Sequence, residues 1–76
     1  MFSPLLLTEK ELEILRLVAI GFRDKEIADK MFLSPRTVNS HMGSIFSKLG
    51  VHSRVQAVVM ALKCGLIKLN EINIGQ

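Results

Sequence analysis

Apolar residues recur at helical spacing in several stretches of this 76-residue chain. The most regular stretch places five of them at i, i+4, i+7, i+8 and i+11: Val38, Met42, Ile45, Phe46 and Leu49. This spacing gives a helix one apolar side that can face a core. Ser34 followed by Pro35 is typical of a helix start, and Gly50 is typical of a helix end. The pattern therefore predicts a helix from Pro35 to about Leu49.

Capping signals predict two helices before this one. Thr8 and Glu11 have the spacing of a capping box, in which each side chain accepts a hydrogen bond from the other residue's backbone N–H. The apolar periodicity that follows ends at Gly21, which can adopt the left-handed conformation common after helices. Asp24 is the predicted cap of a short second helix over residues 25 to about 31.

A fourth helix is predicted after a second capping box, formed by Ser53 and Gln56, and runs to about Cys64 before Gly65. Apolar residues lie on nearly all of its sides, and such a helix is either fully buried or pairs with a partner. Full burial is difficult in so small a domain. We therefore favour a dimer contact over a simple core helix, made by the larger residues of one side: Val55, Val58, Val59 and Leu62.

Very few residues separate the second and third predicted helices, so these helices cross steeply and form a helix-turn-helix. In DNA-binding units of this kind, the second helix enters the major groove of DNA. The polar side of the helix after Ser34 carries small or hydrogen-bonding residues and no carboxylate: Arg36, Asn39, Ser40, Gly43, Ser44 and Ser47. We interpret this side as a groove-reading surface, the alternative being an ordinary solvated face. Gly43 either permits close approach to DNA or is merely tolerated within the helix.

The charge distribution favours an anionic partner. The chain has a net charge of +3 and an isoelectric point near 9.4. Residues 34–68 contain five basic residues and no acidic residue. A solvated face would also explain an excess of charge.

Composition argues against several other classes of protein. The one cysteine, Cys64, cannot form an intramolecular disulfide, and we expect it to pack near a helix end. Neither Cys64 nor the two histidines have metal-ligand spacing, and no nucleophile–base pair indicates catalysis, so we expect no metal, no cofactor and no enzyme. The first four residues lack signal-peptide character and no run reaches about 18 apolar residues, which predicts a cytoplasmic protein without membrane contact.

A series of short motifs follows in one ungapped order: Leu7-Thr8-Glu9-Lys10-Glu11-Leu12-Glu13-Ile14-Leu15, Gly21, Lys25-Glu26-Ile27-Ala28, Leu33-Ser34-Pro35-Arg36-Thr37-Val38 with His41 after it, Lys48-Leu49-Gly50-Val51, and Ser53-Arg54 before Gln56-Ala57. Together they resemble the LuxR/GerE-type DNA-binding domain of bacterial transcription regulators. The resemblance covers about residues 5–66 and leaves 1–4 and 67–76 as flanking tails. It implies an all-α, four-helix domain whose third helix reads bases and whose fourth helix helps two copies dimerise on DNA.

The resemblance also implies individual roles. The base-facing positions fall on Asn39, Ser40 and Gly43. Many family members carry Lys or Arg at the positions of Asn39 or Gly43, and these charges are absent here. The Asn39 amide, which can both donate and accept a hydrogen bond, is then the best candidate for reading a base, and we predict that it contacts adenine. The phosphate-contacting positions of the family fall on Lys25, Thr37, Lys48 and Arg54. We predict Arg36 and Ser44, on the polar side of the same helix as Thr37, as further phosphate contacts.

Three functions stay open at this point. The favoured one is a regulator that binds double-stranded DNA as a homodimer, with RNA polymerase as a further candidate partner and no small-molecule ligand. The second is a protein-interaction module of the same fold with weak or no DNA affinity. The third is a promoter-reading segment like that of a sigma factor, whose pattern fits less well. The chain is compatible with a stand-alone protein and with a piece of a longer regulator.

Overall fold

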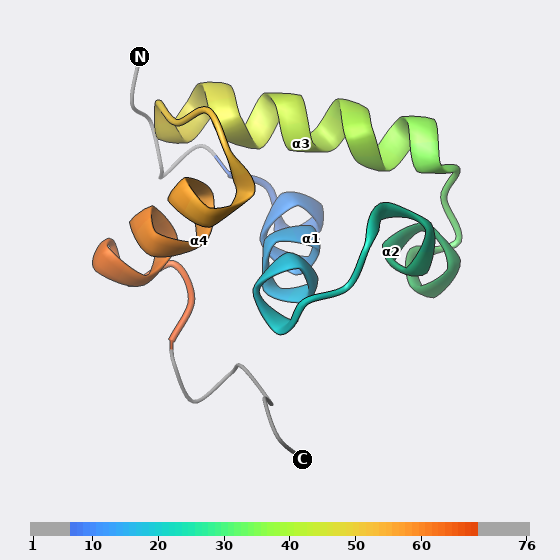
Figure 1. Ribbon diagram of the computed structural model, residues 1–76, viewed down its shortest axis with the longest axis horizontal. Helices are drawn as coiled ribbons and strands as arrows, with labels where there is room; N and C mark the ends of the chain where they lie inside the picture. Colours follow the sequence, from blue (N-terminus) through green and yellow to red (C-terminus); the bar gives the residue numbers. More distant parts are fainter. Residues whose placement is uncertain (1–6, 69–76) are drawn as a thin grey trace.

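The computed structural model describes residues 7–68, so the predicted tail 1–4 and residues 69–76 lie outside it. The described part contains four helices and no strand: α1 (Glu9–Ile20), α2 (Asp24–Met31), α3 (Pro35–Leu49) and α4 (Arg54–Lys63). Figure 1 shows α3 running along one side of the molecule, with α1, α2 and α4 packed beneath it. The predicted all-α class and helix order are confirmed.

The caps of α1 and α3 form as predicted. Thr8 Oγ1 accepts a hydrogen bond from the Glu11 backbone N–H at 3.1 Å, and Glu11 Oε1 accepts one from the Thr8 backbone N–H at 2.8 Å. Gly21, with φ of 113°, ends α1 in the left-handed region. Ser34 Oγ accepts from the Thr37 backbone N–H at 3.1 Å, which satisfies an orphan donor at the start of α3.

The predicted cap of α2 is wrong. Asp24 is the first residue of the helix, and Arg23 is the residue before it. The backbone N–H of Arg23 donates to Glu26 Oε1 at 2.8 Å, so a carboxylate inside the first turn satisfies this end. The carboxylate of Asp24 is instead bound by Arg54.

The second capping box forms only in part. Ser53 Oγ accepts from the Gln56 backbone N–H at 3.2 Å, as predicted. The returning bond differs, because Gln56 Oε1 accepts from the backbone N–H of His52 at 2.8 Å and not from that of Ser53.

The turn between α2 and α3 consists of Phe32, Leu33 and the cap residue Ser34. Phe32 adopts the left-handed conformation with φ of 58°, and its side chain is 94% exposed. The chain can therefore change direction within three residues, and Figure 1 shows α2 nearly end-on while α3 lies in the plane of the page. This is the steep crossing predicted for a helix-turn-helix.

The core decides which side of α4 faces inward. Ala57 and Ala61 are both 0% exposed, whereas Val55 and Val59 are 74% and 44% exposed. Small side chains let α4 approach the rest of the domain closely, so its larger valines are left toward solvent. The core extends to Ile67, one residue into the predicted tail, because this side chain is buried. Cys64 is exposed, which contradicts the packing role expected for it.

Candidate nucleic-acid interface

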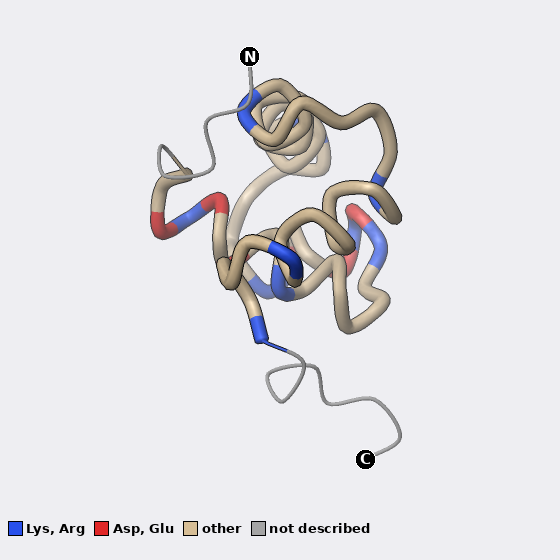
Figure 2. The backbone as a smooth tube through the Cα atoms, turned by 90° about the vertical axis from the view of Figure 1, so that its left-hand side faces the viewer, with Lys and Arg blue, Asp and Glu red and all other residues tan. Residues whose placement is uncertain are grey.

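The outward side of α3 presents the predicted polar residues with the exception of Ser44, which is half-buried. Val38, Met42, Ile45 and Leu49 are buried and orient the helix. The opposite side exposes five residues: Arg36, Asn39, Ser40, Gly43 and Ser47. In Figure 2 α3 is seen almost end-on at the top and carries basic but no acidic residues. The acidic residues of the described part lie on α1 and α2. This arrangement presents hydrogen-bonding groups to an anionic partner without a repelling carboxylate.

Gly43 leaves the backbone uncovered in the middle of this surface. A Cβ built at this position would meet no atom within 4 Å, so packing inside the domain does not require glycine. A glycine inside a helix costs about 1 kcal/mol relative to alanine. The domain itself therefore gives no reason for glycine at position 43. A binding partner that approaches the backbone closely would give one.

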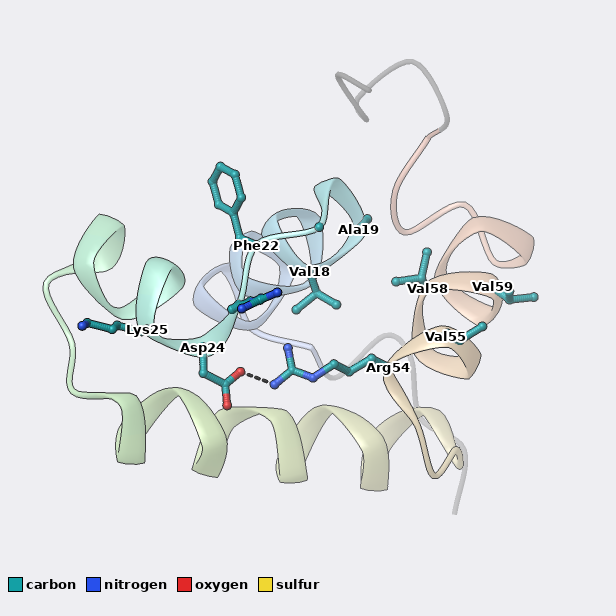
Figure 3. Close-up of a pocket in the computed structure, with 11 residues that line it drawn as sticks. Val18, Ala19, Phe22, Asp24, Lys25, Arg54, Val55, Val58 and Val59 are labelled. Carbon is teal, nitrogen blue, oxygen red and sulfur yellow. Dashed lines mark hydrogen bonds and ion pairs between the residues drawn. The ribbon is translucent and has the colours of Figure 1, made fainter. Parts of the chain in front are cut away.

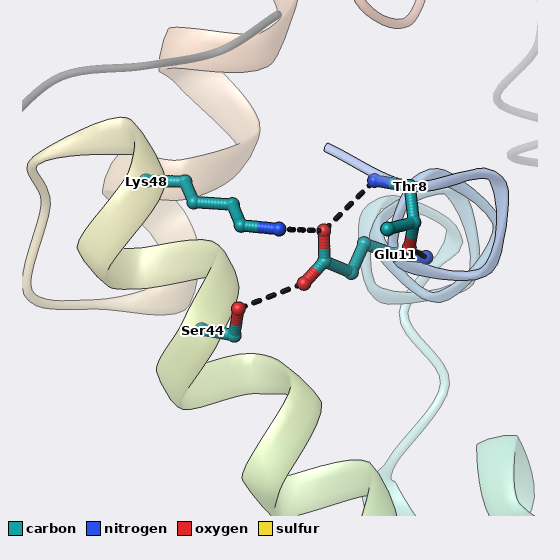
Figure 4. A network of polar contacts seen from close by, with 4 residues as sticks. All are labelled: Thr8, Glu11, Ser44 and Lys48. Atoms are coloured by element: carbon teal, nitrogen blue, oxygen red, sulfur yellow. Dashed lines mark hydrogen bonds and ion pairs between the residues drawn. The ribbon is translucent and has the colours of Figure 1, made fainter. Parts of the chain in front are cut away.

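Glu11 links α1 to the C-terminal half of α3, as Figure 4 shows. Its side chain is only 5% exposed, and Glu11 Oε1 accepts from Lys48 Nζ at 2.7 Å. Its other oxygen, Oε2, accepts from Ser44 Oγ at 2.8 Å. Two predicted phosphate contacts thus bind a carboxylate of their own domain. The sequence indicates Glu11 only as part of a capping box, because Ser44 and Lys48 lie more than 30 residues away along the chain.

The surroundings of Glu11 keep it ionised. Burial by itself raises the pKa of the Glu11 carboxyl. Hydrogen bonds from Lys48, the Thr8 backbone and Ser44, together with the charge of Lys48, outweigh this effect and hold the pKa below its ordinary value of 4.5. The carboxylate therefore contributes to folding as an anion paired with Lys48.

The remaining predicted phosphate contacts fall into two groups. Lys25 and Arg36 are exposed, near the starts of α2 and α3 respectively. Thr37 is half-buried, and its hydroxyl lies 3.0 Å from Ser34 Oγ. Arg54, the first residue of α4, reaches across to the carboxylate of Asp24, as Figure 3 shows. The structure thus leaves some of these groups open to a partner and binds others internally.

An open groove of about 760 Å³ lies between α1, the start of α2 and α4 (Figure 3). Apolar side chains of α1 and α4 form most of its wall, and charged residues line one end. Three of the four predicted dimer residues adjoin it: Val55, Val58 and Val59. The fourth, Leu62, is half-buried, as is Val58.

Within residues 7–68, no three or more His, Cys, Asp or Glu side chains cluster in a way that could hold a metal ion. None of the helices in this part of the chain is long and apolar enough to cross a membrane. The chemistry that the described surface offers is therefore polar and cationic contact along α3 and apolar contact along α4.

Comparison with known proteins agrees with this architecture. The model of the luxR family of bacterial regulatory proteins (GerE) matches residues 5–61. The oxygen regulatory protein NreC of Staphylococcus aureus is 46% identical over 63 residues, which is 83% of this chain but 29% of NreC. The chain therefore spans less than a third of this relative.

Solved structures share both fold and sequence. The transcription factor GerE is 35% identical with a TM-score of 0.79, and the match covers 83% of this chain and 94% of GerE. VqmA of Vibrio cholerae, in a complex with ligand and DNA, is 35% identical with a TM-score of 0.73. That match covers 79% of this chain and 26% of VqmA. The chain belongs to the luxR family of bacterial regulatory proteins, and its four helices are a DNA-binding helix-turn-helix domain of that family.

Proposed function

We propose that the domain regulates transcription by placing the outward side of α3 in the major groove of double-stranded DNA. The observation that carries this proposal is the exposed, carboxylate-free surface of α3 with an uncovered backbone at Gly43. Each base pair presents a distinct pattern of donors and acceptors in that groove. Asn39, Ser40 and Gly43 would face the bases, with Asn39 as the side chain able to donate to and accept from one adenine.

Contacts to the DNA backbone would come first from exposed cations. Lys25 and Arg36 are exposed near helix starts, where the helix dipole also favours an anion. Thr37 adds a hydroxyl close to Arg36. Ser44, Lys48 and Arg54 would reach phosphates only while sharing or exchanging their present carboxylate partners.

Removing either exposed cation should weaken DNA binding in a salt-dependent way. We expect Lys25→Ala and Arg36→Ala each to reduce the slope of log K against log salt by about 0.9, the contribution of one phosphate contact, and to lower affinity on the order of tenfold at about 50 mM salt. The measurement is a titration of a fluorescent duplex at several salt concentrations. The control is Lys63→Ala at the end of α4, and a slope change as large in that variant would contradict the assignment.

The exposed valines of α4 support a dimer. Val55 and Val59 are the large apolar residues of this helix that stay most exposed in one copy. VqmA has been described as a dimer, and 31% of its aligned residues match this chain with a TM-score of 0.76. We propose that two copies pair through α4 on half-sites about one helical turn apart.

Charged residues in α4 should disrupt pairing without unfolding the domain. In the double variant Val55→Lys, Val59→Lys, we expect each substitution to change the free energy of unfolding by no more than about 0.5 kcal/mol, because both sites are on the surface. The complex with a two-half-site duplex should fall from two copies to one, as measured by analytical ultracentrifugation. An unchanged stoichiometry would remove the dimer role and favour a different protein partner for α4.

The proposal is for a binding domain without catalysis or cofactor, acting in the cytoplasm. RNA polymerase is a candidate protein partner of the regulator.

A further inference from the structure

The ion pair between Arg54 and Asp24 links two helix starts. Arg54 begins α4 and Asp24 begins α2, and the guanidinium of one reaches the carboxylate of the other. Their side chains are 39% and 33% exposed, so both remain within reach of a ligand from solvent. Each helix start also carries unsatisfied backbone N–H groups and the positive end of a helix dipole.

The electrostatic surroundings of this pair are otherwise positive. Arg23, Lys25 and Arg54 line the same end of the groove, and Asp24 is the acidic residue among those that line it. Glu26, the other acid in the first turn of α2, has one oxygen bound to the Arg23 backbone N–H. Neither α3 nor α4 contributes an acidic residue. Asp24 therefore provides the negative charge that faces Arg54.

A carboxylate and a phosphate compete for the same guanidinium donors. Arginine is always charged and presents its N–H groups in a planar fork that fits either anion. A phosphate that approached Arg54 would have to displace the Asp24 carboxylate and would then lie beside a like charge. Since a partly exposed ion pair contributes little to stability, this exchange is energetically accessible.

We propose that Asp24 is an internal competitor of the DNA backbone for Arg54, and that it thereby limits the affinity of the domain for DNA. This inference rests on the proposed function, because it requires Arg54 to lie near a phosphate when DNA is bound. It adds to that function a residue that sets binding strength without contacting DNA itself.

Asp24→Asn tests the competition with little change in shape. The amide keeps the side-chain size but removes the charge, so we expect the slope of log K against log salt to steepen by about 0.9 for a fluorescent duplex of random sequence. The gain in affinity over the wild type should consequently be about 3.5-fold larger at 50 mM than at 200 mM salt. The melting temperature should shift by less than about 8 °C, which checks that the variant is folded.

Two further variants isolate the mechanism. Asp29→Asn makes the same charge change at an exposed position of α2 and should leave the slope as in the wild type. In an Arg54→Gln background, Asp24→Asn should give no steepening, because the cation under competition is gone. Steepening that persists without Arg54 would overturn the proposal and indicate a general charge effect.

Other results separate this inference from the proposed function. If the wild type binds with a clear salt dependence and Asp24→Asn binds equally or more weakly, Asp24 does not compete for Arg54, and this inference alone fails. If the wild type shows no salt-dependent binding to duplex DNA, the proposed function fails, and the inference fails with it.

Discussion

Replacement of Glu11 by alanine is expected to destabilise the domain by about 2–3 kcal/mol. Removing one partner of a buried ion pair costs about 3–5 kcal/mol, because the other charge is left without compensation. The Lys48 side chain keeps 26% of its exposure, so water can solvate part of its charge and the cost should be lower here. A domain of this size has a total stability of roughly 4–11 kcal/mol, so the loss is a large share of it.

Urea denaturation followed by circular dichroism measures this loss. The matched control is Glu13→Ala on the same helix, whose side chain is 53% exposed and lies 3.6 Å from Arg16. An exposed pair of this kind contributes little, so the control should change stability by less than about 1 kcal/mol. Equal losses in the two variants would show that the network of Glu11 does not stabilise the fold.

The same network gives stability a defined pH dependence. The pKa of Glu11 is lowered in the folded domain, whereas in the unfolded chain it lies near 4.5. The unfolded chain therefore binds the proton more readily, and the contribution of Glu11 is present above pH about 4.5 and is lost as pH falls through the lower folded value. The free-energy difference between the wild type and Glu11→Gln should accordingly shrink below pH 4.5.

The helices were predictable because their signals are local. Thr8 with Glu11, and Ser34 with Pro35, specify helix starts within four residues, and Gly21 and Gly50 supply the left-handed ends. The polar side of α3 followed from the apolar residues that face the core. Each of these features depends on neighbours in sequence, and the structure confirms them except at Ser44, which is half-buried and donates to Glu11.

The internal ion pairs could not be predicted in this way. Glu11 with Lys48 spans 37 residues, and Asp24 with Arg54 spans 30, so both depend on how the helices pack. The local preference of Asp24 predicts a helix cap, but in the structure its carboxylate pairs with the guanidinium of the distant Arg54. The predicted base and phosphate contacts themselves stay predictions, since they concern a partner.

The sequence does not predict which side of α4 faces the core, and the reason is different. Apolar residues surround this helix, so hydrophobicity alone does not select the buried side. Packing does, because the 0%-exposed Ala57 and Ala61 permit the closest approach. Val55 and Val59 then form a surface that one copy of the domain does not cover.

Gly43→Glu is expected to abolish most DNA binding while the domain stays folded. The new side chain would extend into open space, and glutamate is the better helix former, so stability should stay equal or rise by up to about 1 kcal/mol. On DNA, the carboxylate would lie in the middle of the proposed contact surface. Juxtaposed like charges cost several kcal/mol, which corresponds to a loss in affinity on the order of 100-fold or more.

Two controls separate position from net charge and size. Lys63→Gln lowers the net charge by the same unit at the exposed end of α4, and it should change affinity by less than about threefold, because screening limits the effect of distant charges. Gly43→Ala adds only a methyl group and should weaken binding less than Gly43→Glu does, to an extent that reports how closely the backbone approaches DNA.

The most direct measurement is a fluorescence-anisotropy titration of a short labelled duplex with the wild type, Gly43→Glu and Lys63→Gln at about 50 mM salt, where backbone contacts are strongest. If the outward side of α3 lies against DNA, Gly43→Glu loses binding while Lys63→Gln retains it, and all three proteins melt cooperatively. If folded Gly43→Glu binds as tightly as the wild type, DNA does not contact this side of α3, and the proposed mode of recognition is wrong.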